Sequence, residues 1–436
     1  MTVRTISDLA RVVGPDVAAR AYGKATARII PVLLLAFLAA YLDRVNVGFA
    51  KLQMASDLGF SDAVYGMGAG IFFFGYFLFE VPSNLILHRV GARTWLARIM
   101  VTWGIVSALT ALVHTLWQFY MMRFLLGAAE AGFMPGVIYY LSAWFPAERR
   151  GRVVGLFFIG LGIAGFIGGP LSGAILGYMS GLFGLAGWQW LFALEAIPSI
   201  LVGVLLYLLL EDKVAQAHWL APEEKALITA DLDRERQAKP PLSLGAAIIN
   251  PYLLLMTAIF FICNLCLYGL NFWLPTLIVN MGVHDPVKVG LMSALPSLCA
   301  IVAMVLVSRS SDFRRERRWH LAALYLVGAA GLVGSVVWQH DPVLGLLALC
   351  VATAGILAIP ALFWNLPTAV LSGVAAAGGL AVINSFANLS GFFGPAIVGW
   401  TAQVTGGTGT SILFLAATLV VGAGMVLLVP ARLVNR

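Results

Sequence analysis

Twelve long runs of apolar residues, separated by short polar segments, are the feature that most restricts the fold of this chain. The hydrocarbon core of a bilayer is about 30 Å thick, and about 20 apolar residues in a helix cross it. The composition agrees, because 61% of the 436 residues are hydrophobic and 11% are charged, against about a quarter charged in a soluble domain. We therefore expect an all-α protein of the lipid bilayer with twelve transmembrane helices. The runs cover residues 28–49, 64–87, 94–113, 117–141, 151–177, 188–210, 250–279, 287–308, 319–338, 343–368, 377–402 and 410–430.

Lysine and arginine are distributed unequally between the two sides that these spans define. If the N-terminus is cytoplasmic, all but four of the 27 basic residues lie in cytoplasmic segments; the exceptions are Lys51, Arg44, Arg123 and Lys288. Cytoplasmic loops of membrane proteins carry such an excess of positive charge. The asymmetry predicts a multi-pass protein of the inner membrane with both termini in the cytoplasm. It also accounts for the net charge of +7, so no nucleic-acid partner is expected.

The longest polar segment divides the chain into two halves of six spans each. Pro222, Glu223 and Glu224 open an expected amphipathic helix through Gln237, because proline and acids favour a first helical turn. The predicted parts are an N-terminal segment, a six-helix bundle, a linker with this helix, a second six-helix bundle and a tail. They cover residues 1–27, 28–210, 211–249, 250–430 and 431–436.

Two motifs recur at nearly the same offset and indicate that the halves are repeats. GFIGGPLSG at 165–173 returns as GFFGPAIVG at 391–399, an offset of 226, and HRVGAR from His88 is matched by DFRRER from Asp312, an offset of 224. We therefore expect two pseudo-symmetric bundles. Repeats of this kind place a substrate site near the midplane, between bundles that rock against each other.

Four ionisable residues fall deep inside the first half: Asp43 and Arg44 in the first span, Arg123 and Glu130 in the fourth. Charged groups within a membrane usually mark a transport pathway. Arginines present planar forks suited to a carboxylate, and carboxylates take up and release protons. If an anion and a proton bind one cluster, each changes the affinity for the other. The alternative is two internal salt bridges that only hold helices together.

Four further residues are candidates for gates at the cytoplasmic side. Glu80 lies near the end of the second span, close to Arg89 and Arg93, and Asp312 lies in the corresponding loop of the second half. A plain structural or topological role is the alternative for each. For Glu195, in the sixth span, we favour a structural role.

The second half has no acid or base inside its spans, but it has neutral polar and aromatic residues that suit contacts with substrate hydroxyls. Hydrogen bonding between helices is the alternative for each of them. Tyr76, in the second span, presents the same choice. The second-half candidates are Tyr268, Asn271, Trp273, Trp364, Asn384 and Asn388.

No cofactor, metal site or enzymatic centre is expected. Cys263 and Cys266 have C-x-x-C spacing, but no second Cys or His pair lies nearby, so we interpret them as packing residues. No nucleophile and base stand at a suitable spacing. Gly165, Gly169 and Gly173 begin a strip at every fourth position that continues to Gly177, a pattern that favours close helix contact.

Several motifs together resemble the anion:cation symporter family of the major facilitator superfamily, over residues from about 28 to 430. They are YLDRVNVGFA (41–50), EVPSNLILHRVGAR (80–93), RFLLGAAEAGFMPG (123–136), WFPAERRGR (144–152), GWQWLFALEAIPS (187–199), YGLNFWLPT (268–276) and FWNLPTAVLSG (363–373). The resemblance implies symport of organic acids, such as tartrate, sugar acids or aromatic carboxylates, generally with protons.

The same resemblance implies roles for individual residues. Asp43 and Glu130 match the proton-coupling acids of the family, and Arg44 and Arg123 match its substrate-linked arginines. Tyr76 and Asn388 fall near substrate-contacting positions. One departure is His88, which stands where the superfamily signature usually has an aspartate; this puts the gate-locking role of that loop in doubt.

Proton-coupled uptake of a small organic anion by alternating access, in a monomer, is therefore the leading hypothesis. An exporter or antiporter of the same fold is the first alternative, although two buried arginines suit an anion better than a cation. A membrane receptor or scaffold without transport is the second alternative.

Overall fold

The computed structural model describes residues 15–237, 251–370 and 374–431. All regular structure in these ranges is helical. Among the described residues, eleven helical segments are long and apolar enough to cross a membrane, and α7 adds a shorter apolar stretch at Gly162–Tyr178. These segments correspond to the twelve predicted spans. The helices are α2 (Pro15–Leu58), α3 (Asp62–Val90), α4 (Ala92–Leu109), η1 (Thr110–Leu112), α5 (Leu116–Glu130), α6 (Phe133–Ser142), α7 (Ala147–Tyr178), η2 (Leu182–Gly184), α8 (Gly187–Leu209), η3 (Val214–Gln216), α9 (Pro222–Gln237), α11 (Pro251–Asn280), α12 (Pro286–Arg314), α13 (Arg318–Val337), α14 (Pro342–Phe363), α15 (Asn365–Val370), α16 (Val374–Thr405) and α17 (Gly409–Leu427).

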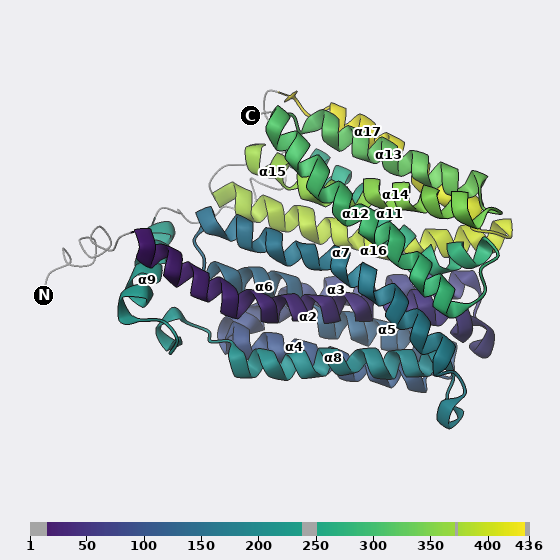
Figure 1. The fold of residues 1–436 in the computed structure, drawn as a ribbon, viewed down its shortest axis with the longest axis horizontal. Coiled ribbons are helices and arrows are strands. Elements are labelled where there is room, and N and C mark those ends of the chain that lie inside the picture. The colour runs from purple at the N-terminus through teal and green to yellow at the C-terminus, as the bar shows by residue number, and fades with distance from the viewer. Residues whose placement is uncertain (1–14, 238–250, 371–373, 432–436) are drawn as a thin grey trace, which may run out of the picture.

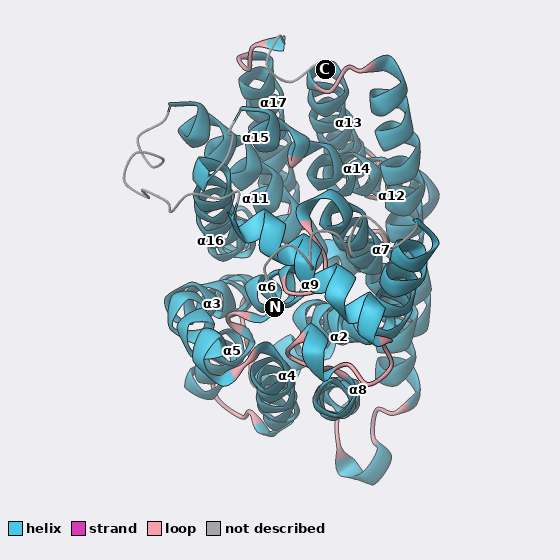
Figure 2. Cartoon of the chain, turned by 90° about the vertical axis from the view of Figure 1, so that its left-hand side faces the viewer, coloured by secondary structure: helices cyan, strands magenta, loops and turns pink. Residues whose placement is uncertain are grey.

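The long helices run side by side, with α2–α8 on one side of the molecule and α11–α17 on the other (Figure 1). Helix α2 begins and α17 ends at the same end of the molecule, which we call the terminal end; the opposite end is the far end. Figure 2 views the terminal end, with α9 lying across it. The two halves meet mainly where α7 packs on α12 and α3 packs on α16.

Side-chain caps explain where several helices begin. The Asp285 carboxylate accepts the Val287 N–H at the start of α12, and the Asp341 carboxylate accepts the N–H groups of Val343 and Leu344 at the start of α14. In both helices a proline follows the capping aspartate at the first position, where its missing N–H costs nothing. Such caps satisfy N–H groups that have no partner within the helix.

Two close glycine contacts show the pseudo-symmetry of the halves. A Cβ added to Gly66 of α3 would lie 3.0 Å from the Cα of Gly399 in α16, and one added to Gly173 of α7 would lie 2.9 Å from the Cα of Gly290 in α12. Gly66 and Gly290 are separated by the offset of 224, and Gly173 and Gly399 by the offset of 226. The same contact therefore occurs twice, once for each repeat. The predicted glycine strip of α7 lies on this surface against α12.

Helix α2 is longer than the predicted first span. Its 44 residues extend over about 66 Å, so residues 15–27, predicted to lie outside the first span, continue its helix. The extension packs against α9, where the Lys24 ammonium binds the Glu224 carboxylate at 2.8 Å and the Tyr22 hydroxyl donates to Asp231 at 2.9 Å. Helix α9 covers the residues predicted for the linker helix. The domain boundaries remain predictions; the boundary between residues 249 and 250, and the predicted tail after residue 431, lie outside the described residues.

Glu224 is an ionised partner in that contact. Burial alone raises the pKa of a carboxyl group, but Lys24 and the Ala221 N–H, which both bind Glu224, hold its pKa below the ordinary value. The carboxylate therefore stays charged and keeps α9 attached to α2.

Two predicted spans are broken helices. The fourth span consists of α5 and α6, with the chain turning at Ala131 and Gly132, and the tenth consists of α14 and α15, separated at Trp364. Gly132 has φ +87°, a left-handed conformation that favours glycine. In the tenth span Pro367 has no N–H for the carbonyl of Phe363, which ends α14. Hydropathy alone detects neither break, because both sides of each remain apolar.

Candidate functional site

Arg44 and Glu130 form a buried ion pair between α2 and α5. A guanidinium nitrogen of Arg44 binds a carboxylate oxygen of Glu130, and their side chains are 15% and 3% exposed. Glu130 is the last residue of α5, directly before the break at Ala131 and Gly132. On the other side of Arg44, the Tyr268 hydroxyl of α11 lies within hydrogen-bonding reach. The pair therefore lies at the surface where the two halves meet.

Arg123 is fully buried on α5, and no carboxylate of the described side chains binds it. Its Nε donates to the Gly68 carbonyl at 3.3 Å, while Nη1 and Nη2 have no hydrogen-bond partner. The guanidinium carbon lies 5.0 Å from the centroid of the Phe72 ring, and that of Arg44 lies 5.5 Å from the same ring. Two cations thus lie near one phenyl ring, and Glu130 supplies one negative charge against their two positive charges.

Asp43 points away from this pair, into the interior of the first half. Its carboxylate accepts hydrogen bonds from the Trp103 indole at 2.7 Å, from Ser107 at 2.9 Å and from Ser199 at 2.5 Å. Successive residues of a helix point about 100° apart, so Asp43 and Arg44 face different neighbours. Among the described residues, the four predicted charged residues contain one ion pair, between Arg44 and Glu130. The alternative hypothesis of two salt bridges therefore does not fit the structure.

Three other predicted contact residues lie close to Arg44. The centroid of the Tyr76 ring is 6.0 Å from its guanidinium carbon, and Tyr268 is within reach as described above. The Asn271 amide donates to the Tyr41 hydroxyl at 2.9 Å, which joins α11 to α2 three residues before Arg44. Neutral groups of the second half therefore face the charged groups of the first.

The remaining predicted contact residues lie elsewhere. Trp273 is fully buried and packs against Lys51 and Tyr65. Trp364 stands at the break between α14 and α15, with its ring 4.9 Å from that of Phe260. Asn384 and Asn388 are half-buried on α16.

The predicted gating residues occupy the terminal end of the molecule. Glu80 of α3 is buried within hydrogen-bonding reach of Ser385 on α16, a contact between the halves. Arg93 instead binds within the first half, where its Nε donates to the Tyr207 carbonyl at 2.6 Å and its N–H donates to Asp212 at 2.8 Å. Arg89 and Asp312 are exposed.

A cluster at the far end was missed from the sequence. It consists of Lys51, Asp62, Tyr65, Trp273 and Thr276, which we call the far-end cluster. Lys51 was predicted to lie just outside the first span, which was taken to end at residue 49, but it is 6% exposed and lies on α2. The sequence did contain a signal for this cluster. Lys51 follows Arg44 by two helical turns, so both lie on one side of α2, and a lysine there indicates a further polar contact. The hydrogen-bond partners of Asp43 were also missed. A signal for one of them was that Ser199 lies on the same face of α8 as the buried acid Glu195.

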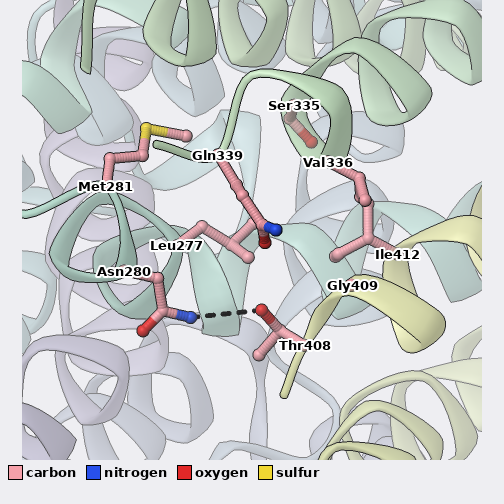
Figure 3. Close-up of a pocket in the computed structure, with 9 residues that line it drawn as sticks. All are labelled: Leu277, Asn280, Met281, Ser335, Val336, Gln339, Thr408, Gly409 and Ile412. Atoms are coloured by element: carbon pink, nitrogen blue, oxygen red, sulfur yellow. Dashed lines mark hydrogen bonds between the residues drawn. The ribbon is translucent and has the colours of Figure 1, made fainter. Parts of the chain in front are cut away.

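Two cavities in the described part of the chain are lined by none of Asp43, Arg44, Arg123 and Glu130. Figure 3 shows one at the far end of the second half, where the Asn280 amide of α11 donates to the Thr408 hydroxyl at 3.2 Å. Its volume of about 10 Å³ is the lower limit for one water molecule. A groove of about 410 Å³ between α4 and α8 has an almost entirely apolar lining, with Arg98 at its edge.

Helical repeats packed as two halves, with broken spans and charged groups between the halves, are the arrangement of a membrane transporter built from repeats. Residues 33–395 match the Major Facilitator Superfamily, and the chain belongs to this superfamily. It is a membrane transporter and not an enzyme.

Three relatives are similar over nearly the whole chain. A protein named metabolite transport protein NicT of Pseudomonas putida is 46% identical over 95% of each chain. A protein named as a tartrate transporter of Agrobacterium vitis is 45% identical, over 96% of this chain and 93% of its own. A quinolone resistance transporter of Acinetobacter baumannii is 40% identical over 94% of each chain. The first two agree with the resemblance to anion:cation symporters.

Solved structures show the same fold. A bacterial homologue of the human lysosomal transporter Spinster, described as inward-facing and occupied, has a TM-score of 0.73 at 16% identity. The superposition covers 92% of this chain and 96% of that one.

Proposed function

We propose that this transporter takes up a small organic anion, such as tartrate, a sugar acid or an aromatic carboxylate, together with protons. It works as a monomer by alternating access in the bacterial inner membrane, with both termini in the cytoplasm. One observation carries the proposal: Arg123 is fully buried, and both terminal nitrogens of its guanidinium lack a partner. Removing one partner of a buried ion pair costs about 3–5 kcal/mol, so a charge left alone in this way is suited to an anion that arrives from outside.

A carboxylate fits this place by its shape as well as its charge. The planar fork of a guanidinium binds both oxygens of a carboxylate at once, and Arg44 lies against the same Phe72 ring. Tyr268 and Asn271 supply neutral hydrogen-bonding groups from the second half. A hydroxylated or aromatic acid bound between them would touch both halves, as alternating access requires.

The Arg44–Glu130 pair supports coupling to protons. While Glu130 is ionised it occupies a nitrogen of Arg44. A proton taken up by the Glu130 carboxylate makes it a neutral carboxyl group, and Arg44 becomes available to the substrate anion. Proton and anion then favour each other's binding, and the coupling is reciprocal.

Uptake of radiolabelled L-tartrate into proteoliposomes under an imposed pH gradient tests the proposal, with R123Q, R123K and the control R98Q. Arg98 lies exposed on α4, away from the site. We expect R98Q to retain uptake and R123Q to lose about 100-fold or more in affinity, because about 1.4 kcal/mol corresponds to each factor of ten. R123K keeps the charge without the fork and should be intermediate. Equal uptake in wild type and R123Q would contradict an anion site at Arg123.

Export is the second candidate, and the similarity to the quinolone resistance transporter favours it. The direction of transport separates the two functions. In vesicles loaded with a fluoroquinolone, an exporter moves the drug outward in exchange for protons, whereas a symporter accumulates L-tartrate along the proton gradient. Proton-driven exchange of the drug without tartrate uptake would replace our proposal with export.

A further inference from the structure

We propose that Glu195 is a further proton-carrying residue of this transporter and that its protonation is coupled to that of Asp43. This inference rests on the proposed proton coupling and extends it to a buried acid assigned above to a structural role. Glu195 is 1% exposed on α8, and its Oε1 accepts the Ser172 hydroxyl of α7 at 2.7 Å.

Helices α2 and α8 face each other through two polar layers. In one layer the Ser199 hydroxyl donates to Asp43 at 2.5 Å. In the other, Asn46 lies within reach of Glu195. Asn46 follows Asp43 by three residues and Glu195 precedes Ser199 by four, so each pair shares one face of its helix. The antiparallel helices therefore place the two acids one helical turn apart.

Three buried atoms in the second layer lack a hydrogen-bond partner: Oε2 of Glu195 and both amide atoms of Asn46. An ionised carboxylate only accepts hydrogen bonds, so it would leave the Asn46 carbonyl oxygen without a donor. A protonated carboxyl supplies that donor, because its Oε2–H points to the carbonyl while the amide N–H donates back. One proton and a small side-chain rotation thus satisfy all three atoms.

Charges around the two acids favour the same assignment. Asp43 acts electrostatically on Glu195, and Glu130 of α5 acts on Asp43. The nearest cations of α2 are engaged elsewhere, Arg44 with Glu130 and Lys51 with Asp62. Of the elements packed against Glu195, α7 contributes Ser172 and α4 contributes Trp103 and Ser107, which are uncharged, among the side chains described. Two ionised carboxylates without a cation would repel each other strongly in a dry interior.

Asp43 is the better site for the negative charge, because it accepts three hydrogen bonds and Glu195 accepts one. One proton is then divided between the two acids: when Asp43 takes up a proton and Glu195 loses its Oε2 proton, Asp43 is neutral and Glu195 is ionised. A purely structural Glu195 would only bind Ser172.

Infrared spectroscopy of the full-length protein in liposomes, without substrate, tests the protonation. A protonated carboxyl has a carbonyl stretch that an ionised carboxylate lacks. We expect a protonated-carboxyl band at neutral pH in wild type and in E223Q, a control at an exposed residue of α9, and its loss in E195Q. In D43N the Glu195 band should disappear at lower pH than in wild type, since ionised Asp43 no longer opposes it. An unchanged band in E195Q overturns the proposal.

The role in transport is tested by the pH profile of L-tartrate uptake. Glutamine keeps the hydrogen bonds of a protonated Glu195 but holds no exchangeable charge. We expect the pH of half-maximal uptake in E195Q to move by about one unit or more, a tenfold change in proton affinity, while tartrate counterflow continues. A profile equal to wild type assigns Glu195 a structural role and overturns the proposal. If wild type transports no tartrate, the substrate class fails while the infrared result stands separately.

Discussion

The Lys51 ammonium of α2 lies 3.7 Å from the centroid of the Trp273 indole ring of α11. The same ammonium binds Asp62 at 2.8 Å, and the Tyr65 hydroxyl donates to the Phe272 carbonyl at 2.8 Å. These contacts join the first half to the second at the far end. Lys51 thus links α2, α3 and α11 in one arrangement, which must separate whenever the far end opens.

Replacing Lys51 with methionine should favour the state that is open at the far end. A buried cation–π contact contributes about 2 kcal/mol, so the equilibrium should shift by about tenfold or more. Cross-linking of a cysteine pair at Ser61 and Gln403, whose side chains are hydrogen-bonded across the halves at 2.9 Å, reports closure. We expect slower cross-linking in K51M and an unchanged rate in K288M, at an exposed far-end lysine. Equal rates in all three proteins would show that Lys51 does not hold the far end closed.

Replacing Glu130 with glutamine should make anion binding independent of pH. In wild type, rising pH ionises Glu130 and returns it to Arg44, so L-tartrate binding should weaken. Glutamine keeps the size of the side chain but never becomes an anion, and Arg44 remains available. Isothermal titration calorimetry across a pH series measures this directly. A pH dependence in E130Q as steep as in wild type would assign the coupling proton to another residue.

Replacing Gly132 with alanine should destabilise the break between α5 and α6. The left-handed φ of +87° and contact of the new Cβ with the Ser83 hydroxyl should together cost about 1–3 kcal/mol. The matched control is G23A on α2, where the added Cβ has open space. Thermal unfolding in detergent should show a lower Tm for G132A and no loss for G23A. A Tm of G132A equal to wild type would mean that the break does not depend on glycine.

The contact between Lys24 and Glu224 should add stability that depends on pH. Because the pKa of Glu224 is lowered in the folded protein, its contribution is complete above the unfolded pKa of about 4.3. It is lost as pH falls through the lower folded value. E224Q should therefore cost up to about 1 kcal/mol at neutral pH and nothing in strong acid. Unfolding of E224Q, with E223Q as the control, tests this; a difference that persists in acid would exclude the ion pair as its cause.

Some features of the fold follow directly from local composition. The twelve spans were predicted because hydropathy over about 20 residues records the solvent that each segment faces. The helix at Pro222–Gln237 was predicted from the proline and acids at its start, and the repeats from motifs that recur at nearly the same offset. The broken spans were not predicted. Gly132 and Trp364 sit within apolar runs, and only the backbone shows that the helix stops there.

The site was predicted as a set of residue types and not as a set of contacts. Asp43, Arg44, Arg123 and Glu130 were selected as candidates, since each is costly in a membrane. Their pairing was not, because it depends on the direction in which each helix turns its side chains. The contact of Trp273 could not be predicted for the same reason. An aromatic residue in a span does not indicate that its ring will form a cation–π contact with Lys51 between the halves.

The sequence by itself determined that this chain lies in a bilayer, that it is built from two repeats and that a few charges are buried within it. The first and last of these properties depend on the transfer of residues from water to lipid, which is nearly additive along the chain, and the repeats are visible as motifs that recur at nearly the same offset. The tertiary structure decided that Arg44 binds Glu130, that Arg123 is left without an anion and that Asp43 faces Ser199. Such pairings depend on atomic distances between helices far apart in the sequence, and electrostatic energies in a dry interior change steeply over those distances.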